Sequence, residues 1–565
     1  MAVFLGFFAF WASEAVAQPA PAGASPGAIR EEFRDKARPQ PERRVGPEAG
    51  APDAETVACG PGIQLRLKSV RIKGSAGLPA VDIEGLAAPL RAFEGKLAEC
   101  DAVFSAADGV IEAIQAAYAA AGYPLVLAFI PAGDVDQEGA ELVIEVIEGH
   151  VAEVDLAGDV EGHTGTLRAL GEKIKASRPL RNADLERYLL LANDLPGRDV
   201  RATFSRIEGD APAGATRMTL TVRHDSVAGT AAVNNHGSRS VGPYRAVGAV
   251  TFNNLLASDE QLRLVHVRTL EDDELAYGSV NLSKVFGSEG LLVEATGTWS
   301  NSIPGYETLT PIGIGSDGIT ASLGASYPVV RSRAVNLTAG LSLEATRLET
   351  TNSLSPGTVA REESRVVRLE AELGWDDPWG GFLSATFTQS QGLDMLGASL
   401  AETVLSGTNG ARIDFSRSVL RLDRSQALFD TGGVSILLSG QGQYAGTRLI
   451  NSELCGFGGR SFGRGYDSFE VSGDHCVMGA AELRSTPDLG IDWLSANVYG
   501  FADAGYVWRM GNAGLNTRRS SAGFGLRLQT ESLRANVEYA KPLEGVVAQE
   551  RDADGRVFFE LGARF

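Results

Sequence analysis

The last ten residues of the chain, RVFFELGARF (Arg556–Phe565), alternate between apolar and polar side chains. Successive side chains of an extended strand point to opposite faces, so Val557 and Phe559 share one face and Glu560 lies on the other. A strand with hydrocarbon on one face and charge on the other suits the boundary between lipid and a water-filled lumen. We take the final aromatic residue, Phe565, as the C-terminal signal of a transmembrane β-barrel.

The same alternation extends upstream to residue 227. Segments such as Leu291–Trp299 and Val367–Trp375 are separated by Gly, Asn, Asp and Ser turns. A soluble β-sandwich gives similar alternation, but not over so many segments. We therefore predict a mainly β protein in which residues 227–565 form a 16-stranded transmembrane β-barrel. The strands are expected near residues 230, 244, 261, 275, 290, 318, 334, 364, 381, 411, 432, 477, 496, 520, 533 and 556.

Two units with a different pattern precede the barrel, at residues 63–149 and 150–226. Each reads as strand, helix, helix, strand, strand. The clearest helix lies in FSAADGVIEAIQAAYAAAGYP (Phe104–Pro124), where Gly122 and Pro124 end the apolar stripe. The sequence therefore predicts two small α/β domains before the barrel.

The N-terminus has the composition of a targeting segment followed by a linker. Ala2–Gln18 holds an apolar core and the small-residue pattern Ala-Val-Ala, so residues 1–17 are expected to be a secretory signal peptide. The alternative is a buried N-terminal helix. Residues 18–62 are rich in Pro, Ala and Gly, as linkers are. Within them Ile29–Lys36 is either a short helix or a solvated charged segment.

Composition limits the function further. The net charge of −20 argues against a nucleic-acid partner, and no apolar run after the N-terminus reaches the roughly 18 residues of a membrane helix. Six scattered histidines form no metal or catalytic motif, so we expect no enzyme activity, cofactor or metal. Four cysteines suit an exported chain with two disulfides. Three pairings are possible, and the local pairs Cys59–Cys100 and Cys455–Cys476 are favoured.

One loop departs from this regularity: GGRSFGRGYDSFEVSGDHC (Gly458–Cys476), between the expected strands 11 and 12. Its glycines, aromatics and two arginines suit packing in a confined space better than exposure at a surface. Glycine at 463 and 465 permits a tight turn and a close approach to the wall. We expect the tip of the loop to fold into the lumen.

The next strand, NVYGFADAGYVW, offers the loop a partner. Alternation places Phe501, Asp503 and Gly505 on its lumen face. A carboxylate there and the guanidinium of Arg464 can form a bidentate ion pair, which we predict. The alternative is that Arg464 and Asp503 are separately solvated charges.

These residues also resemble a known signature. SFGRGYD, followed by GDHCVMGAAELR and FADAG, is similar to the motifs of outer-membrane transporters with POTRA domains. In that superfamily an Arg-Gly-Tyr/Phe loop folds into the barrel, and its arginine contacts the aspartate of a Phe-x-Asp-x-Gly strand. The resemblance assigns the loop role to Arg464, Gly465 and Tyr466, and the wall role to Phe501, Asp503 and Gly505. The common hydrophobic residue before the arginine is Gly463 here.

The two preceding units narrow the resemblance to the ShlB/FhaC/HecB (TpsB) family of two-partner secretion transporters. The similarity lies in AGYPLV, LVIEVIEGHVAEV, DLERYLLLANDLPG and VNNHGSRSVGPYRAVGAVTFNN. It implies export of a large β-helical exoprotein of hemolysin or adhesin type (TpsA-like), recognised by two periplasmic POTRA domains. It also implies an N-terminal plug helix, for which Ile29–Lys36 is the candidate.

The same resemblance sets the expected surroundings: the outer membrane of a Gram-negative bacterium, contact with lipid and lipopolysaccharide, the barrel assembly machinery during biogenesis, and a monomeric state. The main alternative is a factor that itself inserts other barrels. A diffusion porin would not need the two domains, and a surface adhesin would not need an inward Arg464.

Overall fold

A computed structural model describes residues 63–565, except for short gaps at 75–81, 132–137, 161–163, 208–210, 257, 272–273, 306–312, 354–357, 403–409, 430–432, 512–515 and 548–551. The expected signal peptide, the linker, the candidate plug helix and Cys59 lie outside the described residues. Among the described residues, no helix is both long and apolar enough to cross a membrane.

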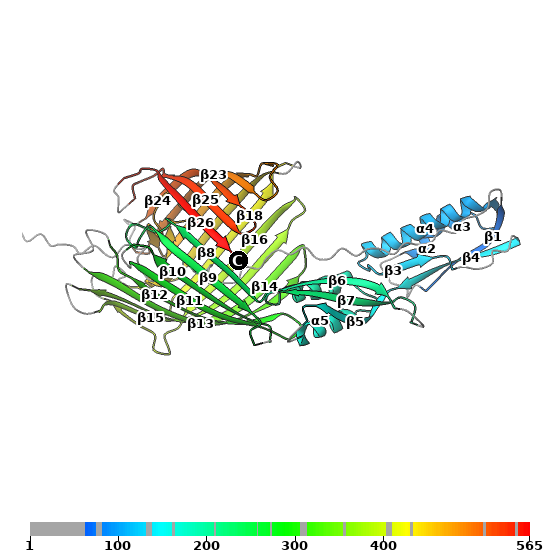
Figure 1. The fold of residues 1–565 in the computed structure, drawn as a ribbon, viewed down its shortest axis with the longest axis horizontal. Coiled ribbons are helices and arrows are strands. Elements are labelled where there is room, and N and C mark those ends of the chain that lie inside the picture. Colours follow the sequence, from blue (N-terminus) through cyan, green and yellow to red (C-terminus); the bar gives the residue numbers. More distant parts are fainter. Residues whose placement is uncertain are drawn as a thin grey trace, which may run out of the picture.

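The barrel is a closed, antiparallel sheet of 16 spanning strands, which confirms the predicted fold class (Figure 1). A further short strand, β17 (Ser399–Glu402), pairs with β15 beyond the end of β16. The spanning strands are β8 (Val227–Asn234), β9 (Arg245–Asn253), β10 (Glu260–Thr269), β11 (Leu275–Phe286), β12 (Leu291–Ser302), β13 (Ile314–Arg331), β14 (Val335–Asn352), β15 (Thr358–Asp376), β16 (Gly381–Gly392), β18 (Ser416–Ala427), β19 (Val434–Ala445), β22 (His475–Ser485), β23 (Ser495–Trp508), β24 (Thr517–Gln529), β25 (Leu533–Pro542) and β26 (Arg556–Arg564).

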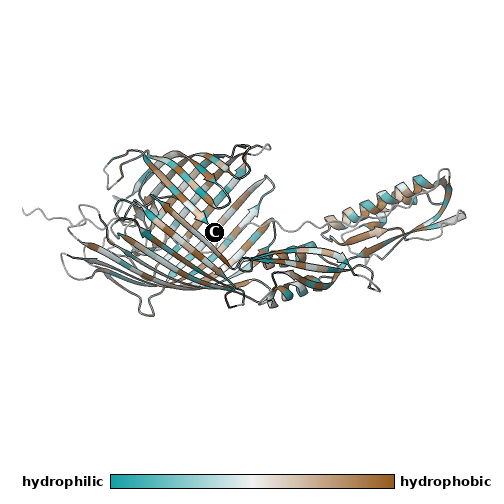
Figure 2. Cartoon of the chain, viewed as in Figure 1, coloured by the Kyte–Doolittle hydropathy of each residue, from teal (hydrophilic) through white to brown (hydrophobic). Residues whose placement is uncertain are grey.

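The two faces of the wall differ as the alternation requires. On β26, Val557 is 59% exposed and Phe559 39% exposed on the outside, whereas Glu560 is largely covered in the lumen. Figure 2 shows apolar residues alternating with polar ones along the strands of the barrel wall. Because β26 is the quoted C-terminal segment, its alternation shows the lipid-facing and lumen-facing sides directly.

The barrel closes where the first strand, β8, meets the last, β26. Five residue pairs join the two strands, from Glu560↔Asn234 to Arg564↔Thr230, and the main chains of Gly229 and Phe565 exchange two further hydrogen bonds. Beyond the end of β8, the side chain of Asn235 continues the ladder: its Nδ2 donates to the carbonyl of Val557 at 2.9 Å and its Oδ1 accepts from the amide of Phe559 at 2.7 Å. The side-chain amide thus adds two bonds to the main-chain bond at this position, in which the amide of Asn235 donates to the carbonyl of Phe559 at 3.3 Å.

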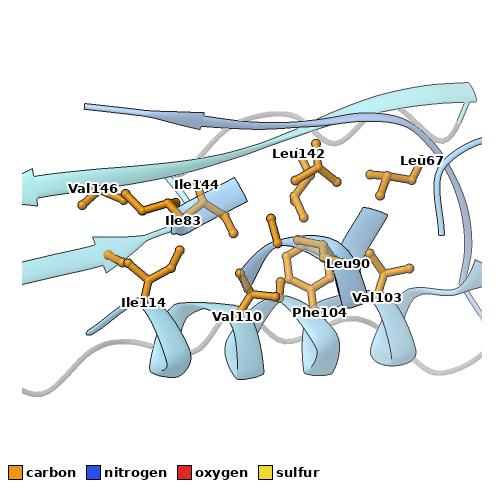
Figure 3. Close-up of a cluster of buried hydrophobic side chains, with 14 of the residues drawn as sticks. Leu67, Ile83, Leu90, Val103, Phe104, Val110, Ile114, Leu142, Ile144 and Val146 are labelled. Atoms are coloured by element: carbon orange, nitrogen blue, oxygen red, sulfur yellow. The ribbon is translucent and has the colours of Figure 1, made fainter. Parts of the chain in front are cut away.

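The first α/β unit is a four-stranded sheet covered on one face by helices. Its elements are β1 (Gln64–Lys73), α2 (Ile83–Leu86), α3 (Ala88–Arg91), β2 (Leu97–Glu99), α4 (Cys100–Ala120), β3 (Val126–Phe129) and β4 (Glu138–Glu148), with the sheet in the order β2-β1-β4-β3. The apolar stripe of α4, including Val110 and Ile114, packs against Ile144 and Val146 of β4 (Figure 3). The extra strand β2 was not expected, because three residues show no alternation to read.

The second unit has the expected order: β5 (His150–Gly158), α5 (Gly165–Ala176), α6 (Asn182–Asn193), β6 (Arg198–Arg206) and β7 (Ala215–His224). Its three strands lie in the order β5-β7-β6, which leaves β6 at one edge. Leu185 and Leu189 of α6 are buried in its core, as helical spacing requires.

The second unit is docked against the turns at one end of the barrel, which we call the domain end (Figure 1). Arg198, at the start of β6, donates to Asp259 of a barrel turn at 2.7 Å, with both side chains buried. Arg331 makes a bidentate pair with Asp194, at 2.8 and 2.7 Å. These charged contacts hold the α/β arm at the domain end.

Candidate functional site

The loop between β19 and β22 (residues 446–474) leaves the barrel at the end opposite the α/β units. It contains a short helix η3 (Asn451–Glu453) and a small hairpin of β20 (Cys455–Phe457) and β21 (Val471–Gly473). Its tip is not exposed: Phe462 and Tyr466 are buried, and Arg464 is only 9% exposed. The tip is buried because it folds back into the lumen, against the inner faces of β22–β25.

Arg464 and Asp503 lie in direct contact. The guanidinium donates through Nη2 to Asp503 Oδ1 at 2.9 Å and through Nε to Oδ2 at 3.2 Å. The backbone amide of Arg464 also donates to Oδ2 at 2.9 Å, and the hydroxyl of Ser521 does so at 3.2 Å. Asp503 is 2% exposed. The two charges are thus paired in bidentate geometry, away from water.

Two further carboxylates, which the sequence reasoning did not single out, complete the site. Arg464 Nη1 donates to Glu482 of β22 at 2.6 Å and lies 3.7 Å from Glu538 of β25. Glu482 is shared with Arg527, whose Nη1 donates to it at 2.7 Å. One guanidinium therefore joins three strands, and alternation on β22 could have placed Glu482 in the lumen.

Aromatic rings pack against the two guanidinium groups of the site. The guanidinium of Arg464 lies 3.4 Å from the ring centre of Phe501, and that of Arg527 lies 3.7 Å from the ring centre of Tyr499. The Tyr499 hydroxyl donates to Glu538 at 2.8 Å or to Asn536 at 3.0 Å. Phe501 thus contributes a cation–π contact that favours a flat guanidinium over an ammonium group.

The glycines of both motifs make room for the loop. Gly463 adopts a φ of +83°, and a Cβ added there lies 2.5 Å from the ring of Phe457. A Cβ at Gly505 of the wall lies 2.4 Å from the same ring. At Gly465, a Cβ lies 2.8 Å from the backbone of Lys541. Phe457, fully buried, therefore fills the space between loop and wall beside Gly463.

Tyr466 and Asp467 extend the contact to the last strands. The Tyr466 hydroxyl lies 2.9 Å from the carbonyl oxygen of Ser520 and 2.5 Å from that of Glu544. Asp467 accepts from Arg556 of β26 at 2.7 Å. The tip thereby reaches from β22 to the closing strand, and it occupies this side of the lumen.

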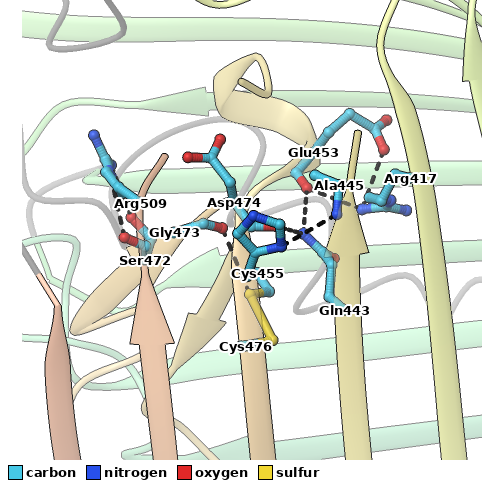
Figure 4. The surroundings of a disulfide bond; sticks show 11 residues. Arg417, Gln443, Ala445, Glu453, Cys455, Ser472, Gly473, Asp474, Cys476 and Arg509 are labelled. Carbon is cyan, nitrogen blue, oxygen red and sulfur yellow. Dashed lines mark hydrogen bonds and ion pairs between the residues drawn. A yellow bond between two sulfur atoms is a disulfide. The ribbon is translucent and has the colours of Figure 1, made fainter. Parts of the chain in front are cut away.

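The root of the loop is covalently tied to the wall. A disulfide joins Cys455 of β20 to Cys476 of β22, with 6.3 Å between the Cα atoms (Figure 4). Cys100, at the start of α4, is also disulfide-bonded. Cys59 lies outside the described residues, so the predicted Cys59–Cys100 pair stays a prediction. Within the described chain, His, Cys, Asp and Glu side chains form no group of three or more that could hold a metal ion.

The site is a loop held inside a closed barrel by ion pairs and a disulfide, an arrangement that can be compared with known proteins. A sequence model of the haemolysin secretion/activation proteins ShlB/FhaC/HecB matches residues 214–528, more than half of the chain. The chain belongs to the ShlB/FhaC/HecB family. Membership places it among two-partner secretion transporters, which work with an exoprotein partner, and not in a family of enzymes. No curated individual protein matches the chain.

Solved structures agree with the fold of this family. CdiB from Escherichia coli is similar with a TM-score of 0.71 at 18% identity, over 98% of this chain and 100% of that one. CdiB from Acinetobacter baumannii gives 0.63 at 14%, over 95% and 96%. BamA from Haemophilus ducreyi lacking POTRA domains 1-3 gives 0.53 at 14%, over 88% and 100%. The closed barrel of this fold indicates an outer-membrane protein.

Proposed function

We propose that this family member exports one large, β-helical exoprotein of hemolysin or adhesin type through its barrel. The observation that carries the proposal is the loop locked in the lumen by Arg464 and Asp503, in a barrel that holds two α/β units at its other end. A loop tip held in the lumen by non-covalent contacts can move aside without a covalent bond being broken. The contact between Arg464 and Asp503 is therefore compatible with a channel that opens when an exoprotein passes through it.

The two α/β units are proposed to be POTRA domains, at residues 63–149 and 150–226, that face the periplasm and receive the unfolded exoprotein. Edge strands can bind an extended segment by main-chain hydrogen bonds. Strand β6 is an edge of nine residues, and its first residue, Arg198, is anchored to Asp259 at the barrel rim. A segment paired along β6 would therefore end beside the barrel mouth. The corresponding edge β3 has only four residues.

In the proposed mechanism the arriving segment displaces the tip of the loop, and Arg464 exchanges its carboxylate partners for water or for the passing chain. The exoprotein then threads the lumen and folds outside, without nucleotide hydrolysis. Residues 1–17 would direct the chain to the periplasm, and the segment 18–62 would supply the plug. The barrel would work as a monomer in contact with lipid and lipopolysaccharide, after insertion by the barrel assembly machinery.

A second candidate function is insertion of other barrels into the membrane, which the likeness to BamA favours. The two differ in substrate. A transporter releases one soluble exoprotein into the medium, whereas loss of an insertion factor lowers the amounts of many barrels in the membrane.

The test is export of the exoprotein encoded beside the gene, measured in the culture medium. Deletion of residues 63–224 should stop export, with barrel insertion checked by its heat-dependent migration on gels. Arg464→Asp and Asp503→Arg should each lower export, and the double exchange should restore part of it. Normal export by the deletion variant would overturn the proposal.

A further inference from the structure

The loop that carries Arg464 has a second buried charge at its root. Glu453, the last residue of η3, is 0% exposed. Its Oε1 accepts from Arg368 Nη2 of β15 at 2.6 Å, and its Oε2 accepts from Arg368 Nη1 at 3.1 Å and lies 3.1 Å from Arg417 Nη1 of β18. A bidentate contact of this kind fixes both position and orientation.

The main chain at Glu453 is held as well. Its carbonyl oxygen accepts from Arg417 Nη1 and from Gln443 Nε2 of β19, each at 3.1 Å (Figure 4). Arg368 also donates to Glu344 of β14 at 2.9 Å and to Ser390 of β16 at 2.7 Å. One loop carboxylate is therefore seated in a network that joins five neighbouring strands.

The root of the loop (residues 446–454) and its tip (residues 458–470) carry opposite charges and contact different parts of the barrel wall. At the tip, a loop arginine enters a wall of carboxylates on β22, β23 and β25; at the root, a loop carboxylate enters a wall of arginines on β15 and β18. Between them stand the Cys455–Cys476 disulfide and the paired strands β20 and β21.

Apolar packing separates the two ends in the same way. Leu449 and Ile450 of the root pack with Val366 and Phe415. The tip residues belong to a different buried cluster, around Phe457. The two ends therefore pack in separate buried clusters.

We propose that Glu453 is a positioning residue of the transporter: it holds the root of the loop on the β15–β18 wall, so that the loop opens by movement of its tip about a fixed root. This inference rests on the proposed function for its consequence in export, but its structural content can be measured on purified protein alone. Loss of Glu453 should loosen the root and leave the tip contacts of Arg464 in place.

The test uses Glu453→Gln, which keeps the shape and removes the charge. In the purified full chain, we expect hydrogen exchange of residues 446–454 to speed up several-fold while residues 458–470 stay close to wild type. Arg464→Gln should do the reverse. Arg368→Gln should also loosen residues 446–454, and the effect of the double variant should be smaller than the sum of the two single effects, because the two changes share the contact between Arg368 and Glu453.

The matched control is Asp377→Asn. Asp377 is another buried carboxylate paired with an arginine of β18, Arg424, but it lies in a turn at the domain end and does not touch the loop. This control should leave exchange of 446–454 unchanged. Glu453→Asp, which retains the charge, should fall between wild type and Glu453→Gln, and it serves with Arg368→Gln if Glu453→Gln does not insert.

Exchange of 446–454 at the wild-type rate in both Glu453→Gln and Arg368→Gln would overturn the proposal, as would equal loosening of root and tip. In export assays we expect several-fold less exoprotein from Glu453→Gln. If export is unaffected by Arg464→Gln and by Glu453→Gln alike while exchange changes as expected, the proposed function fails and the anchoring role of Glu453 stands.

Discussion

The contact between Arg464 and Asp503 can be tested as a free energy. Both side chains are buried, so removing one partner leaves the other charge uncompensated, which costs about 3–5 kcal/mol for a buried pair. The two single substitutions should not cost the same free energy. Arg464→Gln removes the cation from three carboxylates, whereas Asp503→Asn leaves Arg464 its contact with Glu482 at 2.6 Å. We expect about 3 kcal/mol for Arg464→Gln and about half of that for Asp503→Asn.

Proteolysis of the loop measures this quantity. When opening is fast relative to cleavage, the cleavage rate follows the population of the undocked loop. Chymotrypsin cuts beside Phe462 and Tyr466, which neither change alters. A loss of about 3 kcal/mol should raise the rate roughly a hundredfold for Arg464→Gln, and Asp503→Asn should raise it about tenfold.

The double variant decides whether the two residues act as a pair. In a double-mutant cycle, partners in contact give a coupling energy of about 0.5–3 kcal/mol, so the double change should cost less than the sum of the single ones. Additive effects, or single effects within a factor of about two of wild type, would refute the reasoning. The intact barrel is checked in each variant by its heat-dependent migration.

Three further changes should have distinct effects. Gly505→Ala places a methyl group 2.4 Å from the Phe457 ring and should raise loop cleavage, with part of the effect reversed by Phe457→Leu. Cys476→Ser, together with Cys455→Ser, should cost about 3 kcal/mol in the chain-entropy model and speed hydrogen exchange of the hairpin; exchange as in wild type would contradict this. Partial burial raises the pKa of Glu289, but the hydrogen bond and positive charge of Lys173 on α5 lower it by more. The pKa of Glu289 is therefore below its ordinary 4.5. Docking of the second unit should therefore be strongest above that value and weaken as the pH falls through the lowered pKa, and Glu289→Gln should remove this dependence in a cross-linking assay.

Much of the architecture was predictable because alternation is a local property. The 16 expected strand positions lie in the 16 spanning strands or up to five residues before them, the largest difference being 411 against the start of β18 at Ser416. The lumen face of β23, with Phe501, Asp503 and Gly505, follows from its two-residue period. The loop ends follow from strand counting. The first four residues of α4, before Phe104, and the strand β2 were outside such reasoning, because short segments carry no period.

The partners of the loop were harder to predict. Alternation places Glu482 in the lumen but does not say which loop residue reaches it, because that depends on the stagger of β22 against β25. The network that holds Glu453 includes side chains from five strands, which come together only in the folded barrel. Phe457 fills a space that exists only after Gly463 and Gly505 have come together. Such contacts arise from three-dimensional assembly and have no local signal.

The seam between β8 and β26 also determines when the barrel can close during folding. Most neighbouring strands are joined by short connections, but the seam contact of Asn235 with Val557 spans 322 residues. Contacts of such separation form late, because the intervening chain must first be ordered. Until β26 has paired with β8, the sheet has two unpaired edges, which invite aggregation. A chain lacking residues 556–565 would leave a sheet that cannot close, so the tube depends on the strand that lies farthest in sequence from the one it meets.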